Sequence, residues 1–240
     1  MKTVHIALSY SGGSGKTRLS VDIASVLKCK IIEYTPVSDL DNFKGLYEIE
    51  KIGMNTPIES FFDNIEHLFS TNSPKDIVID TDKSISVSMV EYLKTEKETL
   101  FKRFEKNNIK IVFHLVVSLY GLRTSLDILL DIFSSSLKEF LPDKSVVLWL
   151  NYYFKDTNFE NVDMWVNKEY GLDRCLKKIG IFNYGKYTKL TKKSIERRAK
   201  YSTYSFFLDG RSKDNSDALD RDRISNILKQ ITMQINSLYK

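Results

Sequence analysis

The stretch Val4-His5-Ile6-Ala7-Leu8-Ser9-Tyr10-Ser11-Gly12-Gly13-Ser14-Gly15-Lys16-Thr17 joins a short apolar run to a glycine-rich turn. Apolar residues then recur at helical spacing up to Lys28, beginning with Leu19 and Ile23. This order predicts a strand over 4–9, a loop, and a helix over 17–28. Glycines let backbone N–H groups converge on an anion without side chains in the way, so the loop is a candidate phosphate-binding site.

The remainder of the chain alternates short apolar runs with helical patterns. Strands are predicted at 30–34, 76–80, 109–117 and 146–150, and helices at 57–70, 84–107 and 123–140. A basic helix over 189–207, a polar break over 209–217 and an amphipathic helix over 219–239 follow. The alternation predicts an α/β fold, with a doubly wound, mainly parallel sheet covered by helices on both faces. We expect one nucleotide-binding domain over 1–240, with a basic helical part from about residue 185.

Composition and length bound the class of protein. The 240 residues are 42% hydrophobic and 28% charged, as in ordinary globular chains, which excludes a disordered or fibrous protein. No apolar run suits a signal peptide or a membrane span, so a cytoplasmic location is expected. Cys29 and Cys175 lack the spacing of zinc or redox sites, and we expect buried thiols. His5 and His114 fall inside predicted strands, where core imidazoles are expected.

The loop assigns chemistry to individual residues. The candidate nucleotide-binding residues are Ser11, Gly12, Gly13, Ser14, Gly15, Lys16, Thr17 and Arg18. Lys16 would counter the charge of the β- and γ-phosphates, and the Thr17 hydroxyl would ligate Mg²⁺. The strict motif has glycine at position 10, where this chain has Tyr10. The alternative is a glycine-rich turn that serves packing alone.

Two carboxylates at predicted strand ends complete the candidate catalytic set. Asp80 ends a buried strand and would hold Mg²⁺, directly or through water, beside Thr17. The alternative for Asp80 is a helix-capping or loop carboxylate. Glu33 also ends a strand next to the loop and could orient a water molecule, while Thr35 carries no charge. Lys16, Glu33 and Asp80 are therefore the candidate catalytic residues.

The doublet Gly12-Gly13 after Tyr10 resembles the deviant Walker A box of the ParA/MinD family of ATPases. That box reads Lys-Gly-Gly-x-Gly-Lys-Thr/Ser, and Ser11 stands where the family carries its signature lysine. The chain is most similar to the TraL/StbB-like branch of plasmid conjugation and stability proteins. The stretches 32–38, 79–93, 114–129 and 147–153 resemble successive motifs of that branch, and the likeness covers roughly 4–155.

The resemblance implies ATP and Mg²⁺ as cofactors and a homodimer that forms on nucleotide binding. It implies that Asn151 hydrogen-bonds adenine, since its amide can both donate and accept; a turn asparagine is the alternative. It also implies a plasmid partition or relaxosome partner protein. Ser11 and Thr35, which replace a lysine and an acid of the family, predict weak hydrolysis.

Basic residues gather in one interval, where aromatic residues stand among them. The candidate DNA-binding residues are Lys186, Lys189, Lys192, Lys193, Arg197, Arg198 and Lys200. Such a composition suits phosphate contacts with occasional stacking, so non-specific DNA is a candidate partner. The alternative is a solvated helix face. The final amphipathic helix is expected to pack on the sheet, and a membrane anchor is not favoured.

These patterns lead to one functional hypothesis and two rivals. The hypothesis is an ATP-binding ParA/TraL-like switch in plasmid partition, stability or conjugative transfer, with weak or partner-stimulated hydrolysis. The first rival is a small-molecule or nucleotide kinase, for which the basic interval would serve as a lid. The second is a degenerate P-loop module that binds without turnover.

Overall fold

The computed structural model describes residues 2–10, 14–35, 40–43, 48–53, 56–71, 74–117, 127–128, 131–132, 139–152, 179–185, 188–196 and 218–239. The strands are β1 (Lys2–Leu8), β2 (Lys30–Tyr34), β3 (Ile49–Lys51), β4 (Asp76–Thr81), β5 (Ile109–Val117), β6 (Val146–Asn151) and β7 (Ile179–Tyr184). The helices are α1 (Lys16–Leu27), α2 (Ile58–Thr71), α3 (Lys83–Lys106), α6 (Lys189–Ser194) and α8 (Ala218–Asn236). Two short 3-10 helices, η1 (Leu40–Phe43) and η7 (Ser237–Tyr239), complete the described elements.

The seven strands form one parallel sheet in the order β3-β2-β4-β1-β5-β6-β7. The central strand β1 lies between β4 and β5, and all its neighbours run the same way. The carboxyl ends of the strands therefore meet at one edge. In register, Asp80 of β4 lies level with Ala7 of β1 on one side and with Glu33 of β2 on the other.

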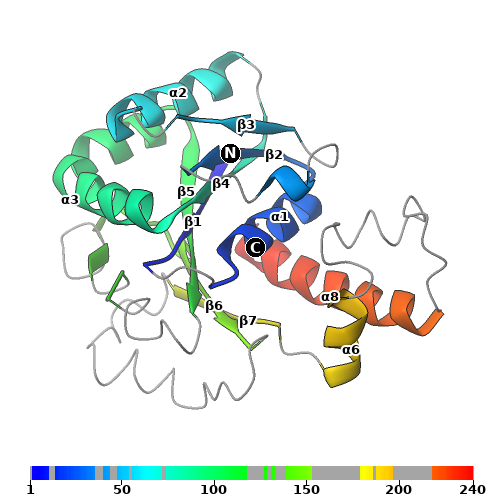
Figure 1. Cartoon of the computed structure of the whole chain (residues 1–240). Coiled ribbons are helices and arrows are strands. Elements are labelled where there is room, and N and C mark those ends of the chain that lie inside the picture. Colours follow the sequence, from blue (N-terminus) through cyan, green and yellow to red (C-terminus); the bar gives the residue numbers. More distant parts are fainter. Residues whose placement is uncertain are drawn as a thin grey trace.

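Helices cover both faces of this sheet, which confirms the predicted α/β doubly wound fold (Figure 1). Helices α2 and α3 lie on one face, and α1 and α8 lie on the other. Successive side chains of a strand point to opposite faces, so each strand supplies both cores. In β5, for example, Ile111 and Phe113 belong to the α2/α3 core, whereas Val112 and Val116 belong to the α1/α8 core.

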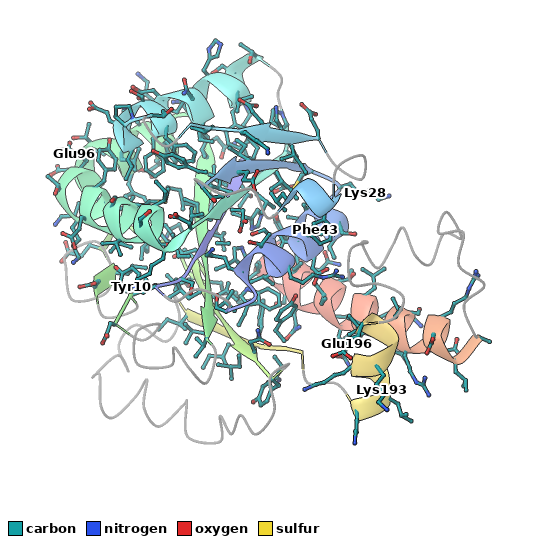
Figure 2. The ribbon with its side chains drawn as sticks, viewed as in Figure 1. Tyr10, Lys28, Phe43, Glu96, Lys193 and Glu196 are labelled. Carbon is teal, nitrogen blue, oxygen red and sulfur yellow. The ribbon has the colours of Figure 1, made fainter. Side chains whose placement is uncertain are left out.

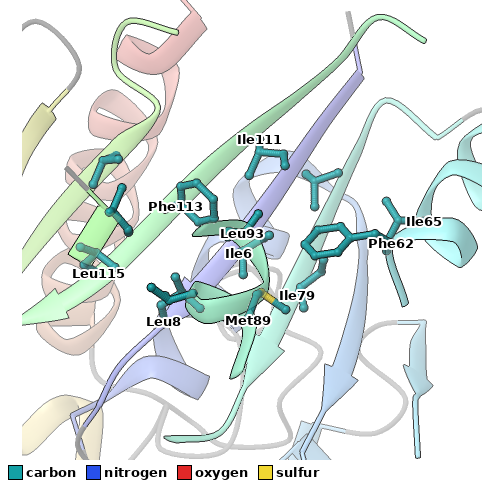
Figure 3. Packing of buried hydrophobic residues seen from close by; sticks show 14 of the residues in the cluster. Ile6, Leu8, Phe62, Ile65, Ile79, Met89, Leu93, Ile111, Phe113 and Leu115 are labelled. Atoms are coloured by element: carbon teal, nitrogen blue, oxygen red, sulfur yellow. The ribbon is translucent and has the colours of Figure 1, made fainter. Parts of the chain in front are cut away.

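The α2/α3 core is apolar and rich in aromatic rings (Figure 3). Phe62 of α2 is fully buried, stacks on Tyr92 of α3 and meets the edge of Phe104. Met89 and Leu93 of α3 pack beside Ile6 and the other inward residues of β1. Asp82 caps α3 by accepting a 2.7 Å hydrogen bond from the Ile85 amide, which fixes where the helix begins.

The α1/α8 core confirms that the final amphipathic helix packs on the sheet. Its isoleucines Ile224, Ile227, Ile231 and Ile235 are buried with Trp149 and residues of α1. Among the described residues, none of the helices combines the length and apolarity needed to cross a membrane.

Some predicted elements differ from the structure or lie outside the described residues. Strands β3 and β7 were not predicted, because β3 is a three-residue edge strand and β7 contains glycine and asparagine. The predicted helix over 123–140 falls mostly outside the described residues. Of the predicted helix over 189–207, the described part contains α6, and the rest lies outside.

Candidate nucleotide site

The loop that follows β1 ends at Gly15, the residue before α1. Gly15 has φ of 91°, a left-handed conformation that side-chain-bearing residues rarely adopt. A Cβ at this position would also lie 2.8 Å from Nδ2 of Asn151. Glycine is therefore required here by both backbone conformation and space. Ser11, Gly12 and Gly13 lie outside the described residues.

The start of α1 has the features of an anion site. Its N-cap residue is Gly15, which has no side chain to cap the first turn and so leaves those N–H groups open to a ligand from that position. The Ser14 side chain is buried, and its hydroxyl has no hydrogen-bond partner within the described part of the chain. A buried hydroxyl without a partner is costly, and a phosphate oxygen would satisfy it. Lys16 and Thr17 occupy the first turn of the same helix.

Asn151 holds the loop from the neighbouring part of the sheet. It is the last residue of β6, only 2% exposed, and its Nδ2 donates a 2.7 Å hydrogen bond to the Ser14 carbonyl. The amide group therefore contacts the loop backbone in this structure. The expected adenine contact stays a prediction.

Asp80 lies beneath α1, at the carboxyl end of β4. Its carboxylate accepts hydrogen bonds from the hydroxyls of Ser20, at 2.8 Å, and of Thr17. Burial raises the pKa of Asp80, although the Lys16 charge and both hydroxyl donors act in the opposite direction. The structure therefore brings Lys16, Thr17 and Asp80 together, as the sequence predicted.

This group of oxygens fits the preferences of Mg²⁺. The ion takes few protein ligands and keeps several waters, so one hydroxyl and one carboxylate form an adequate donor set. Thr17 and Asp80 supply them, and a bound cation would compensate the buried carboxylate. In the described ranges, His, Cys, Asp and Glu form no group of three or more that could hold a metal without other ligands.

Glu33 lies on the same side of the sheet as Asp80, one strand further out. It is 1% exposed, accepts a 3.3 Å hydrogen bond from the Leu40 amide and lies 3.8 Å from the Lys51 ammonium. Its negative charge contributes to the raised pKa of Asp80. Glu33 thus holds η1 against the strand end, and its predicted water-orienting role remains a prediction.

Hydroxyl groups that sequence reasoning missed fasten the loop to α3. Thr81 donates a 2.7 Å hydrogen bond to the Ala7 carbonyl, and its hydroxyl lies 2.8 Å from that of Ser86. Ser86 in turn accepts from the Ser9 amide at 3.2 Å. Serine and threonine at the start of a helix usually suggest capping, and nothing in the sequence separates that use from this one.

Tyr10, which replaces the motif's first glycine, lies two residues beyond the end of β1 (Figure 2). Its hydroxyl donates to Asp131 at 3.3 Å, and Lys94 of α3 lies 2.9 Å from the other oxygen of that carboxylate. Burial raises the pKa of Tyr10, and the Asp131 charge adds to the effect. The tyrosine thus ties the start of the loop to α3.

On the other side of the loop, Arg18 pairs with Asp22 within α1. The Nε of Arg18 lies 3.2 Å from Oδ1 of Asp22, while the Tyr184 hydroxyl donates to Oδ2 at 2.8 Å. The guanidinium also lies over the Phe43 ring, 5.9 Å from its centroid. Arg18 therefore connects α1 with η1, and its partner Asp22 connects α1 with β7.

Three of the candidate DNA-binding lysines are described, all on α6. Lys189 and Lys193 are exposed, and Lys193 is labelled beside Glu196 in Figure 2. Lys192 is less exposed, and its Nζ donates a 2.9 Å hydrogen bond to the Tyr152 carbonyl, next to Asn151. Lys186, Arg197, Arg198 and Lys200 lie outside the described residues.

The fold and site together have the form of a parallel α/β domain with a candidate phosphate loop after its central strand. In comparisons with known proteins, no family model matches this chain. No curated protein matches it either.

Proposed function

We propose that this chain is an ATP-binding switch protein, similar to the ParA and TraL type, in plasmid partition, stability or conjugative transfer. The observation that supports it most is the cluster at the carboxyl edge of the sheet. There Lys16 and Thr17 begin α1 directly after the left-handed Gly15, and Asp80 lies beside them. A phosphate group and its cation need these residue types at one point.

In this proposal, the backbone N–H groups of the loop and Lys16 bind the β- and γ-phosphates. Thr17 and Asp80 hold Mg²⁺, which neutralises charge on the phosphate oxygens when it is bound. Asn151 keeps the loop in shape through the Ser14 carbonyl. Ser20 orients the carboxylate of Asp80.

Hydrolysis is weak or stimulated by a partner in this proposal. Ser11 cannot bring a positive charge to the γ-phosphate, and Thr35 carries no carboxylate to position water. Glu33 is held by the Leu40 amide instead of facing open solvent. The bound nucleotide would therefore act chiefly as a switch, controlling association with a second copy, with non-specific DNA, or with a partition or relaxosome partner protein.

Calorimetric titration with ATP, ADP and GTP, with and without Mg²⁺, tests the proposal. We expect Mg²⁺-dependent ATP binding that weakens by roughly ten- to a hundredfold in Lys16→Ala, since a charge-assisted phosphate contact contributes about 1.5–3 kcal/mol. Lys106→Ala is the matched control, because it removes one exposed lysine from the C-terminal end of α3, outside the candidate nucleotide site. Equal affinity for ATP in wild type and Lys16→Ala would reject the phosphate-loop assignment.

Turnover and DNA binding separate the rivals. Slow ATP loss, stimulated by duplex DNA, supports the switch, whereas rapid ADP production with a small-molecule acceptor supports a kinase. Lys189→Glu combined with Lys193→Glu should weaken DNA binding and leave ATP affinity unchanged if α6 contacts DNA. Loss of ATP binding in that variant would indicate a lid. A protein that binds none of the three nucleotides would be a degenerate module.

A further inference from the structure

A chain of hydrogen-bonded polar side chains crosses the α1/α8 face of the sheet, away from the nucleotide site; it is buried except at Tyr239, which is 38% exposed. It joins Trp149 of β6, His114 of β5, His5 of β1, Tyr239 of η7 and Asp76 of β4. Nε1 of Trp149 pairs with Nδ1 of His114, and Nε2 of His114 pairs with Nδ1 of His5. Nε2 of His5 pairs with the Tyr239 hydroxyl, which pairs with Oδ1 of Asp76. Each pair is 2.9 Å apart. Both imidazoles are fully buried.

The donors in this chain can point in only one direction. An indole N–H donates and cannot accept, so Nδ1 of His114 must be an acceptor. His114 is then neutral, with its proton on Nε2, and donates to Nδ1 of His5. His5 must therefore carry its own proton on Nε2 and donate to Tyr239, whose hydroxyl donates to Asp76. One indole thus determines the tautomer of two histidines.

The two histidines of the closed chain have no place for another proton. Each histidine has a single nitrogen without hydrogen, and that Nδ1 already accepts a hydrogen bond. Burial lowers the pKa of His114 well below its usual value, and the neighbouring His5 adds to this. Burial also lowers the pKa of His5, although Asp76, 3.8 Å away, opposes it.

Other titratable groups near the chain come from several elements. The positive charge of Lys110 in β5 helps to lower the pKa of His5. The Lys75 ammonium lies 5.7 Å from the centroid of the Tyr239 ring. Burial, and then the Asp76 charge, raise the pKa of Cys29, which follows α1. Lys144, before β6, donates a 3.1 Å hydrogen bond to the Ser237 carbonyl. Asp76 is the only carboxylate among these groups, and its Oδ1 accepts from Tyr239. The charges around the chain therefore offer a protonated pair little compensation.

The joint between His5 and Tyr239 is the one that can open. His5, His114 and Trp149 belong to β1, β5 and β6, each paired on both sides in the sheet. Tyr239 belongs to η7, which directly follows α8. We propose that this row of hydrogen-bonded side chains, from Trp149 to Asp76, is an acid-operated latch. It holds η7 and α8 on the sheet at neutral pH and releases them when the histidines take up protons. Because α8 also packs against α1 and α6, release would reach both helices.

Proton linkage gives the direction in which the open population changes with pH. Once η7 has left, Tyr239 no longer fixes the His5 ring, which can turn its Nδ1 away from the His114 N–H and expose it to water. A histidine exposed in this way binds protons below its ordinary pKa of about 6.5, whereas in the closed state it does not. The open population should therefore rise as pH falls below about 6.5. The rise is about tenfold per pH unit for one exposed histidine and about a hundredfold for two.

Hydrogen exchange followed by mass spectrometry, between about pH 7.5 and about pH 5.5, tests the latch. After correction for intrinsic exchange, amides of α8 and η7 should lose about ten- to a hundredfold of protection per pH unit, while those of β1 and β5 keep theirs. His5→Gln and His114→Gln should each remove about one factor of ten from this slope. His67→Gln, which changes an exposed histidine of α2, should leave it unchanged.

Two measurements keep the proposal testable if a histidine variant does not fold. Tyr239→Phe lacks only the hydroxyl, and it should lower the protection of η7 and α8 at neutral pH. In wild type, nitrogen NMR should find both buried histidines as neutral Nε2–H tautomers. An Nδ1–H tautomer, or protection of α8 that follows that of β1 at every pH, would overturn the latch. ATP binding plays no part in these readouts, so they stand apart from the proposed function.

Discussion

The two faces of the sheet are built from the same strands but differ in chemistry. The α2/α3 face is closed mainly by apolar and aromatic side chains, with Phe62 fully buried; Thr81 and Ser86, which are buried there, carry uncharged hydroxyls. The α1/α8 face buries Asp80, Glu33 and the histidine chain as well as its apolar residues. Because strand side chains alternate, one sequence can build a mainly apolar core on one face and place buried ionisable side chains on the other. The comparison suggests that the first face supplies mainly stability, while the second also carries chemistry.

The largest expected effect is on the apolar face. Phe62→Ala removes a fully buried ring that packs on Tyr92 and Phe104, and should lower the free energy of unfolding by about 3–5 kcal/mol. Urea unfolding measures the change. Val87→Ala on α3, where the side chain is 40% exposed, is the control and should cost less than about 1 kcal/mol. Similar losses in the two variants would contradict the apolar core described for this face.

A smaller change in the free energy of unfolding, with a different pH dependence, is expected on the α1/α8 face. Trp149→Phe keeps an aromatic ring but removes the N–H that donates to His114, and should cost about 1–3 kcal/mol at neutral pH. Nδ1 of His114 then has no donor and becomes free to bind a proton. The pKa of His114 should rise from its lowered value toward the ordinary value of about 6.5. Below about pH 6.5 the variant should therefore lose less stability per pH unit than wild type, because its folded state can now also bind the proton.

Unfolding curves at several pH values measure this shift. Phe113→Leu, on the α2/α3 face of β5, is the matched control because it removes ring volume without touching a polar partner. Its stability should fall by a similar amount at every pH. If the pH profile of Trp149→Phe instead runs parallel to that of wild type, the one-directional hydrogen-bond chain is incorrect.

The smallest change in the free energy of unfolding is expected at the carboxyl edge of the sheet, where the substitution should stabilise the protein. Burial raises the pKa of Asp80, so the folded state favours the uncharged form, and at neutral pH the carboxylate is a net cost. Asp80→Asn should raise the free energy of unfolding by about 1 kcal/mol without Mg²⁺, and the gain should shrink as pH falls toward the ordinary pKa of about 3.9.

Thermal unfolding with and without Mg²⁺ checks both parts of this prediction. The variant should also lose the Mg²⁺ dependence of ATP binding. Ser20→Ala is a useful companion, since it removes a donor to the same carboxylate and should destabilise slightly. If Asp80→Asn is less stable than wild type in the absence of Mg²⁺, the carboxylate is a structural anchor and not a group held ready for a cation.

The sequence predicted the parallel sheet because its central strands are strongly patterned. The bounds of β2 and β5 agree with the prediction, since each is built around consecutive β-branched residues. The meeting of Lys16, Thr17 and Asp80 was also predicted, because parallel strands end at a common edge. Strands β3 and β7 were missed, since edge strands carry weaker patterns.

Contacts between distant parts of the sequence could not be predicted. His5 and His114 were correctly expected to be core imidazoles, but their pairing depends on the strand order, which places β1 beside β5. Likewise, the bond from Asn151 to Ser14 depends on where β6 ends relative to the loop. Side-chain hydroxyls such as Ser20 have no sequence signal that separates a carboxylate partner from a backbone one.

The position of β1 in the sheet has a consequence for synthesis of the chain. Both neighbours of β1 come later in the sequence, at residues 76–81 and 109–117. A nascent chain that has released only β1, α1 and β2 therefore carries a strongly apolar strand with both edges unpaired, a state open to wrong pairing with other chains. Ribosome-bound chains that end before residue 117 should consequently depend on chaperones, and that dependence should fall once β5 has emerged.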